Sequence, residues 1–438
     1  MMPLPTIVAR DIVPWSPSAA PIELPLNSLT LTWRSCSDDI DSTLWRECFT
    51  PEQQGLFWYR TLERSNLEDQ FRFFYGLLWR DTTVVGIVPA FLFDVPMELV
   101  APPVLMRLLR SIAVGPLRRL RYLRTFFIGN VAGEEGALGL RAPLRFEDVA
   151  ALVHDAAQQK ANELGAPMLT WKDLEADRLD ALTPIARARR LFSMASYPGT
   201  SVAVDARGFH AFLATQKSSR RHQIKKKLRR GDEAVPVIIA EVRSPAEPEL
   251  HELSALFQQT YDKARTHFER LDIQFFREIA RCNEATFIVL RASATNRAVA
   301  FMLVFKLGTR VINQFIGLDY KAGKDHFLYF RLFTAAYNWA AAQGAEWMQS
   351  GQTGYRAKLD LGHELVPLWN CCRHRNPLVN YLLSKISTGI SWRTLDPDLR
   401  NYLEAHPDAD PRLNQHQQLR STSRAKPPSH FATVRAPE

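Results

Sequence analysis

One succession of predicted elements occurs twice along the chain, and it limits the possible fold more than any single motif does. Each copy consists of two β-rich runs, a strand ending in Ile-Gly, a helix ending at glycine and a short strand. The first copy occupies residues 71–80, 82–93, 126–130, 146–165 and 167–171, and the second occupies 285–293, 298–307, 312–319, 326–344 and 345–350. We expect the helices to end at Gly165 and Gly344, because glycine adopts the left-handed conformation that closes many helices.

Two such β-β-β-α-β units predict a mixed α/β (α+β) fold with two similar domains, each a mostly antiparallel sheet flanked by helices. The length of 438 residues leaves room for two or three domains, and the boundary is expected near 197–200. The predicted organisation is a flexible N-terminal lead, a first domain, a second domain and a disordered tail, at residues 1–27, 28–199, 200–400 and 401–438.

The composition places the chain among globular proteins, with 46% hydrophobic and 23% charged residues. Five cysteines without a C-x-x-C motif make a poor disulfide framework, so we expect reduced thiols in a cytoplasmic protein. Cys371 and Cys372 are expected to be buried small hydrophobic residues, because neighbours on a strand point to opposite faces and cannot serve one site. The sequence shows no secretory signal and no uncharged run of the ~18 residues that a membrane-spanning helix needs.

An arginine-rich segment at 99–133 contains no acidic residue and alternates its charges with large apolar side chains. One interpretation is a surface helix that covers the sheet with a solvated arginine face. The other is a basic amphipathic helix on the inner face of an anionic membrane, with about 1 kcal/mol from each arginine near the surface. The arginines proposed for this peripheral contact are Arg107, Arg110, Arg118, Arg119, Arg121 and Arg124.

A second basic cluster, residues 217–230, carries eight Lys or Arg residues in fourteen positions, with Ser218 or Ser219 as the expected N-cap. Such a helix attracts phosphate-rich partners, although basic runs are often only solvated faces. The run contains no aromatic residue on which a base can stack, so sequence-specific nucleic-acid binding is not expected.

The stretch at 209–230 resembles the start of the second domain of bacterial GNAT-superfamily proteins labelled peptidoglycan biosynthesis/recognition acetyltransferases. Its Phe-x-x-Phe-Leu-Ala opening is followed by Ser, Arg and an Ile flanked by basic residues. Three further stretches agree in order, at residues 256–279, 312–319 and 350–367. The Gly-x-x-x-Lys-x-x-x-Gly sequence formed by Gly354, Lys358 and Gly362 is similar to that of the wider Fem-type aminoacyltransferases.

This resemblance implies a tandem GNAT fold and an enzyme that transfers an acyl group from a thioester or ester to an amine. We expect acyl-CoA as the co-substrate, with its phosphates at Lys321, Gly323 and Lys324, where a helix begins and free backbone N–H groups favour phosphate. The alternative to a phosphate site is a tight turn in which the two lysines are solvated. The loop holds one glycine where acetyl-CoA enzymes of the superfamily commonly have several, which departs from the usual CoA-binding loop.

Two pairs of residues are candidates for taking a proton from the acceptor amine. Asp319 and Tyr320 end a strand at the edge where ligands of open α/β sheets gather, although Asp319 also suits a turn cap. His267 and Glu269 lie in a loop between two predicted helices, where either a titrating pair or a surface ion pair fits.

Three further candidates follow the last strand of the second unit. Gln352 and Tyr355 offer neutral hydrogen bonds, and Lys358 offers a cation for a phosphate or carboxylate of the acceptor. The alternative makes Lys358 a structural ion pair with Asp360 or Glu364.

The predicted function is therefore N-acyl transfer from acyl-CoA to an amine, such as a lipid or cell-envelope amine. A Fem-like transfer from aminoacyl-tRNA to a cell-wall precursor is the first alternative, and a non-catalytic GNAT-fold binding protein is the second. No metal is expected, because the sequence contains neither H-E-x-x-H nor a P-loop.

Overall fold

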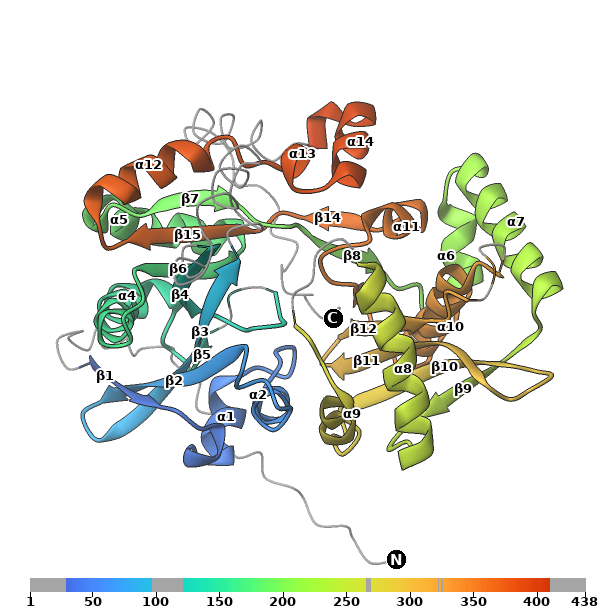
Figure 1. Ribbon diagram of the computed structural model, residues 1–438, viewed down its shortest axis with the longest axis horizontal. Helices are drawn as coiled ribbons and strands as arrows, with labels where there is room; N and C mark the ends of the chain where they lie inside the picture. Colours follow the sequence, from blue (N-terminus) through green and yellow to red (C-terminus); the bar gives the residue numbers. More distant parts are fainter. Residues whose placement is uncertain are drawn as a thin grey trace, which may run out of the picture.

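The computed structural model describes residues 29–96, 121–134, 136, 138–264, 269–321, 323 and 326–409. The predicted lead and most of the predicted tail lie outside these residues. Two sheets, each flanked by helices, stand side by side (Figure 1). The predicted fold class, two mixed and mostly antiparallel sheets with helices, is confirmed.

The first sheet has the strand order β1-β2-β3-β4-β6-β15-β7, with β5 paired to β3. Its strands are β1 (Leu29–Arg34), β2 (Phe71–Arg80), β3 (Thr83–Pro96), β4 (Tyr122–Ile128), β5 (Gly139–Leu140), β6 (Met168–Leu174), β7 (Phe192–Ala195) and β15 (Trp369–His374). The helices of this part are α1 (Ser42–Cys48), α2 (Leu56–Glu63), α4 (Phe146–Glu163) and α5 (Ala176–Arg189).

The second sheet has the strand order β14-β8-β13-β12-β11-β10-β9. Its strands are β8 (Gly199–Ala203), β9 (Val237–Val242), β10 (Ala285–Ala292), β11 (Ala298–Leu307), β12 (Arg310–Leu318), β13 (Trp347–Gln349) and β14 (Glu364–Val366). The helices are α6 (Phe209–Thr215), α7 (Ser218–Ala234), α8 (Glu247–Lys263), α9 (Ile273–Ile279), α10 (Leu328–Ala342) and α11 (Tyr355–Asp360), followed by α12 (Pro377–Ser387), α13 (Trp392–Leu395) and α14 (Pro397–Ala405).

The repeated pattern in the sequence corresponds to a repeated topology. In each sheet one pair of strands is parallel, β4 with β6 and β12 with β13, and the central helix α4 or α10 connects its two members. The predicted helix ends are confirmed, because Gly165 and Gly344 follow the helices with φ of 68° and 67°.

Two parts of the predicted boundaries need correction. Strand β15, expected inside the 200–400 domain, lies between β6 and β7 of the first sheet and is hydrogen-bonded to both. The first residues of the predicted tail belong to α14, because Leu399 and Leu403, one helical turn apart, are buried in a cluster with Trp392. The remaining division into domains stays a prediction.

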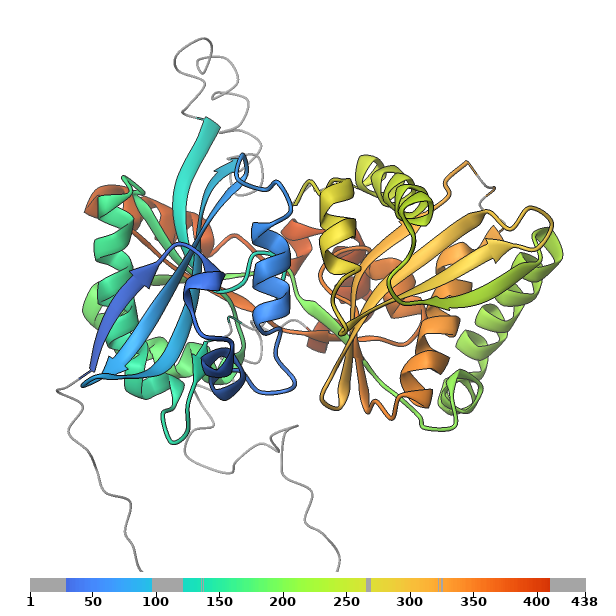
Figure 2. The same cartoon turned by 90° about the horizontal axis from the view of Figure 1, so that it is seen from below.

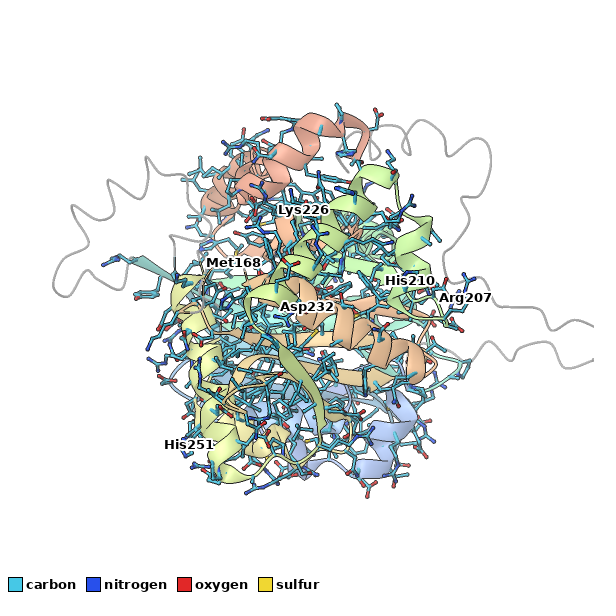
Figure 3. The ribbon with its side chains drawn as sticks, turned by 90° about the vertical axis from the view of Figure 1, so that its right-hand side faces the viewer. Met168, Arg207, His210, Lys226, Asp232 and His251 are labelled. Carbon is cyan, nitrogen blue, oxygen red and sulfur yellow. The ribbon has the colours of Figure 1, made fainter. Side chains whose placement is uncertain are left out.

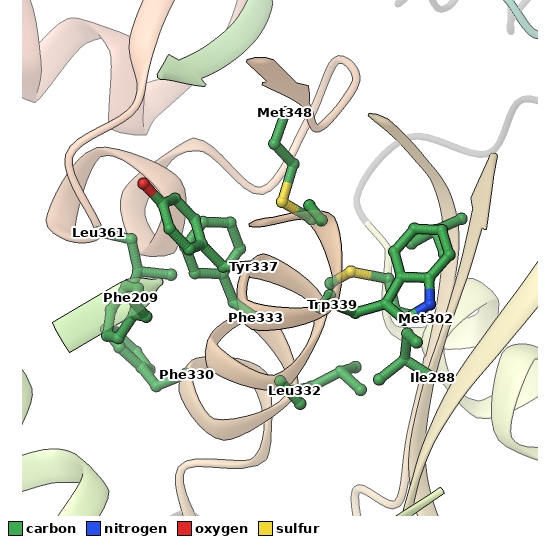
Figure 4. Packing of buried hydrophobic residues seen from close by; sticks show 14 of the residues in the cluster. Phe209, Ile288, Met302, Phe330, Leu332, Phe333, Tyr337, Trp339, Met348 and Leu361 are labelled. Carbon is green, nitrogen blue, oxygen red and sulfur yellow. The ribbon is translucent and has the colours of Figure 1, made fainter. Parts of the chain in front are cut away.

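A dense apolar core fixes α10 against the second sheet (Figure 4). Leu332 and Phe333 of this helix are fully buried in the cluster that also holds Ile288 and Met302 of the strands. This packing holds the first turn of α10 in a fixed place beside the end of β12.

A second cluster joins the two sheets. Figure 2 shows α2 and α9 side by side between the two lobes. Trp58 of α2 is fully buried there, and its ring centroid lies 5.5 Å from that of Phe305 and 6.3 Å from that of Phe315. The shared core fixes the position of one lobe against the other.

The buried-thiol prediction is confirmed for Cys371 and Cys372, which are 1% and 2% exposed. Burial raises the pKa of each thiol to about 12, so neither is a thiolate at neutral pH. Among the described helices, none has the length and apolar character that crossing a bilayer requires.

Candidate active site

The candidate site is a cleft that opens where β12 and β13 separate. The two strands pair only from Arg310 with Trp347 to Ile312 with Gln349, whereas β12 continues to Leu318. Beyond this point a cavity of about 660 Å³ lies between them. Its walls also include residues of the first sheet's loops, so both halves of the molecule contribute to one cleft.

A glycine at each end of α11 places Lys358 in this cleft. Gly354 begins the helix with a φ of 64° and Gly362 follows it with a φ of 93°, conformations that side chains disfavour. The Lys358 ammonium donates hydrogen bonds to the carbonyls of Ser350 and Gly351, the latter at 3.0 Å. The Gly-x-x-x-Lys-x-x-x-Gly sequence therefore specifies a short helix that presents a lysine.

Lys358 is 7% exposed, and burial lowers its pKa to about 8, with the carboxylate of Glu134 acting in the opposite direction. The buried side chain of His363 links α11 to the loop before it through hydrogen bonds to Lys358 and Ser350. Its Nδ1 lies 3.0 Å from the Lys358 carbonyl, which only accepts, so Nδ1 carries the proton and Nε2 accepts from the Ser350 hydroxyl at 3.0 Å. Burial lowers the pKa of His363 to about 3, so the ring is neutral at physiological pH.

The loop before α11 is strained. Thr353, a β-branched residue, has a φ of 94°, which costs of order 1–3 kcal/mol and persists only where the surroundings enforce it. Gln352 donates to the Tyr197 carbonyl at 2.8 Å, and Thr200 donates to the Gly351 carbonyl at 2.9 Å. These contacts hold the loop that carries the carbonyl partners of Lys358.

Glu134 brings a carboxylate from the first half of the chain. It accepts a hydrogen bond from Gln349 at 2.7 Å, and a Cβ at Gly199 would collide with it. Its charge acts on Lys358, although 224 positions (358 − 134) separate the two residues in the sequence. Opposite charges from the two halves therefore meet in the cleft.

Lys172 of β6 adds a second cation to the wall of the cleft, and Glu269, which lies before α9, adds a carboxyl group. Lys172 donates to the Gly133 carbonyl at 2.8 Å and contacts the buried carboxylate of Asp173. Glu269 is half-buried in the cleft wall. Burial raises the pKa of Glu269, and the nearby Lys172 opposes this shift. Glu269 is thus suited to exchange a proton nearer neutrality than an ordinary carboxyl group.

Two polar atoms in the cleft have no hydrogen-bond partner among the described residues: Asn313 Oδ1 and the Tyr329 hydroxyl. Asn313 is only 5% exposed, and an unpaired buried polar group costs about 1–3 kcal/mol. Both atoms are therefore positioned to bind the polar parts of a ligand. The sequence analysis missed them, although a polar Asn-Gln pair inside the apolar β12 was a signal.

A family model described as peptidoglycan biosynthesis/recognition, FemAB-like, matches residues 154–386, which is more than half of the chain. The chain belongs to the FemAB-like family. This confirms the family resemblance inferred from the sequence.

Solved structures resemble the FemAB-like chain in fold at low identity. FemX is 12% identical with a TM-score of 0.52, over 81% of this chain and 99% of FemX. A tandem GNAT protein from the clavulanic acid biosynthesis pathway is 12% identical with a TM-score of 0.46, over 80% and 99% of the two chains. L-PGS from Bacillus licheniformis is 13% identical with a TM-score of 0.45, over 72% and 89%. No curated protein matches the sequence.

The structure brings Glu269, Tyr320, Gln352 and Lys358 of the predicted site residues into the FemAB-like cleft. Asp319 instead pairs with Arg297 at 2.6 Å and accepts from the Lys321 backbone at 3.0 Å, as the turn-cap alternative predicts. It does not line the cleft. His267 and Lys324 lie outside the described residues.

Tyr355 also lies outside the cleft, because its ring is fully buried and its hydroxyl donates to the Pro198 carbonyl at 2.9 Å.

The alternative that made Lys358 a structural ion pair is wrong. Asp360 pairs with Lys227 at 2.9 Å, and Lys358 binds backbone carbonyls. Lys321 and Gly323 lie before α10, and no described side chain caps the N-terminus of this helix. Tyr329, in the first turn of α10, lines the same cleft as Lys358.

The two basic segments differ in what the structure describes. Of the six arginines proposed for membrane contact, the structure describes Arg121 and Arg124, and Arg124 forms an exposed ion pair with Asp94 at 2.9 Å. The 217–230 cluster forms most of α7, whose N-cap is Lys217 and not either serine. Figure 3 shows α7 on the outer surface with Lys226 on it, and Lys225 and Lys226 are exposed.

Replacing Tyr355 with phenylalanine tests the structural role of this tyrosine. We expect the free energy of unfolding to fall by about 1–2 kcal/mol, because the buried Pro198 carbonyl loses its donor. Turnover should stay within about twofold once an assay is established. Urea denaturation measures the stability, and a more than tenfold loss of turnover at unchanged stability would contradict the structural role.

Proposed function

We propose that the protein is an N-acyltransferase that moves an acyl group from a phosphate-bearing carrier to an amine in the cleft between β12 and β13. The observation that carries this proposal is the Lys358 ammonium, which two carbonyls of a strained loop aim into a cleft with carboxyl groups on its walls. Family membership and the two-unit fold support it.

Amide formation needs a neutral amine and stabilisation of the oxygen on which negative charge develops. The amine attacks the acyl carbonyl, a C–N bond forms, and the carbon–sulfur or carbon–oxygen bond to the carrier breaks. Two N–H groups of Lys358 are used by the Ser350 and Gly351 carbonyls, which leaves the third for the carbonyl oxygen of the acyl group. Glu269 takes the proton that the amine loses.

The carrier is proposed to lie along β12 toward the start of α10. The N-terminus of this helix, which no described side chain caps, favours phosphate, and Tyr329 and Asn313 offer hydrogen bonds to the polar groups of the carrier. Phe257, Phe315 and Ile316 supply apolar walls for a thioester arm or an acyl chain. We therefore propose acyl-CoA as the donor.

An aminoacyl-tRNA donor is the second candidate, and α7 favours it. Its exposed lysines lie on a helix that is tied to α11 by the Lys227–Asp360 ion pair, and α11 carries Lys358. A polyanion on this helix would therefore lie near the cleft.

The acceptor is proposed to be a primary amine of a cell-envelope precursor or lipid. Glu134 and Glu269 give the cleft carboxyl groups that attract an aminium ion before it loses its proton.

Purified protein supplied with each donor in turn and a panel of lipid and peptide amines tests the proposal. Release of free CoA thiol with formation of an amide is the expected result for palmitoyl-CoA or acetyl-CoA, and insensitivity to ribonuclease accompanies it. Ribonuclease-sensitive transfer from charged tRNA would establish the second candidate. If neither donor supports turnover and CoA at 100 times any plausible dissociation constant fails to give the ~2.7 kcal/mol of stabilisation that binding implies, the transferase proposal is wrong.

A further inference from the structure

Helix α12 presents an apolar face that no described part of the protein covers. Leu378, Tyr381 and Leu382 are 68%, 57% and 52% exposed, although each is a large hydrophobic residue. They lie three and four positions apart and therefore share one side of the helix. Figure 1 shows α12 at the outer edge of the first sheet, beside β7.

The helix is held rigidly, so this face is a built surface. The Asn380 side chain accepts from the His374 backbone at 2.8 Å and donates to the Arg190 carbonyl at 2.9 Å, which ties α12 to both neighbouring segments. Asn376 caps its N-terminus by accepting from the Leu378 backbone at 2.9 Å. The apolar side chains therefore point outward from a helix that is fixed in place, and their exposure does not come from fraying of the helix.

The surroundings of this face are basic. Residues 365–395 contain no Asp or Glu, and Arg190, Arg375 and Lys385 are exposed on or beside the helix. The Lys385 ammonium lies 5.3 Å from the centre of the Tyr381 ring. An apolar stripe with tyrosine and a cationic rim is the pattern of helices that lie in the interface of an anionic bilayer.

The strand register places a second exposed aromatic at the same end of the sheet. Met168 of β6 pairs with Thr125 of β4 on one side and with His374 of β15 on the other. Tyr122, 52% exposed at the start of β4, therefore lies at the end from which α12 departs. Strand β3 ends and β4 begins at this same end, because Pro96 pairs with Tyr122.

We propose that the outer face of α12 docks the protein onto an anionic membrane surface. Charge repulsion disfavours two other occupants of this face, a second copy of the chain and the chain's own stretch at 99–120. A second copy docked through the same face would bring two sets of Arg190, Arg375 and Lys385 together, and the stretch at 99–120 is itself basic. Negative lipid headgroups complement the rim, and the interface accepts the apolar stripe. This inference does not depend on the transferase activity.

Vesicle flotation of the purified full chain tests the proposal. We expect binding to phosphatidylcholine vesicles containing roughly 30% phosphatidylglycerol, and much weaker binding to phosphatidylcholine alone. The combined variant Leu378→Ser, Tyr381→Ser, Leu382→Ser should lower the binding constant at least about tenfold. The variant Arg375→Glu, Lys385→Glu should lower binding to the anionic vesicles by about tenfold and reduce its salt dependence.

The matched control is Ile238→Ser, Ile239→Ser, which removes an exposed apolar pair from β9 of the other sheet. It should bind the vesicles as the unaltered protein does. Unaltered binding by the α12 triple variant, or equal loss in the β9 control, would overturn the proposal. So would light scattering that finds a dimer of the unaltered chain and a monomer of the α12 variant, because the face would then be an interface between copies.

Discussion

Replacing Lys358 with methionine is expected to lower kcat about 100- to 1000-fold, the loss seen when one donor to a developing oxyanion is removed. Methionine keeps much of the buried volume but donates no hydrogen bond to the acyl oxygen. The free energy of unfolding should change by at most about 2 kcal/mol, because the lost bonds to the two carbonyls are offset by removal of a buried charge. The matched control is Lys160→Met on α4, a partly buried lysine that pairs with Glu163 away from the cleft and should retain full turnover.

The pH profile distinguishes the possible roles of this lysine. Burial lowers the pKa of Lys358 to about 8, so the group is charged below that pH and neutral above it. If the ammonium is the active form, kcat should fall as the pH rises through about 8. Glu269, whose pKa burial raises, must be ionised to accept a proton and gives the rising limb on the acid side. An increase of kcat through pH 8 that is absent from the Lys358→Met variant would instead identify Lys358 as a base and contradict the oxyanion role.

Replacing Trp58 with alanine is expected to lower the free energy of unfolding by about 3–5 kcal/mol. The indole is fully buried between the two sheets and donates to Asn130 at 3.0 Å. Because its ring contacts Phe315, which lines the cleft, the substitution should also raise KM. We expect calorimetry to show two separated unfolding transitions in place of one, since the shared core links the two halves.

The control for Trp58 is Trp45→Ala. Trp45 is 1% exposed in a cluster formed by residues of the first half alone. A similar loss of stability is expected there, but without separation of the two transitions. A loss below about 1 kcal/mol in the Trp58 variant, or identical behaviour of both variants, would show that the shared cluster does not couple the halves.

The local signals of the sequence were sufficient for the repeated architecture. Strand runs of buried apolar residues and glycines after each central helix specify backbone conformation within a few positions, and Gly165 and Gly344 lie where this reasoning placed them. The Gly354, Lys358, Gly362 spacing likewise specifies a local structure, because both glycines adopt a positive φ at the two ends of a short helix. In each case the residue type itself restricts the local backbone conformation or the burial of that position.

Tertiary structure alone decided which distant groups meet. Nothing near Glu134 in the sequence indicates that it acts on Lys358, nothing near Asp319 indicates whether its carboxylate faces the cleft or Arg297, and nothing near Trp369 indicates that β15 returns to the first sheet. The local backbone conformation of a residue depends on its sequence neighbours. The partners of its side chain depend on which distant segments the fold brings together, over hundreds of positions in this chain. The sequence by itself therefore determined two β-β-β-α-β units and the glycine-flanked lysine, and the packing of the two units against each other decided the cleft.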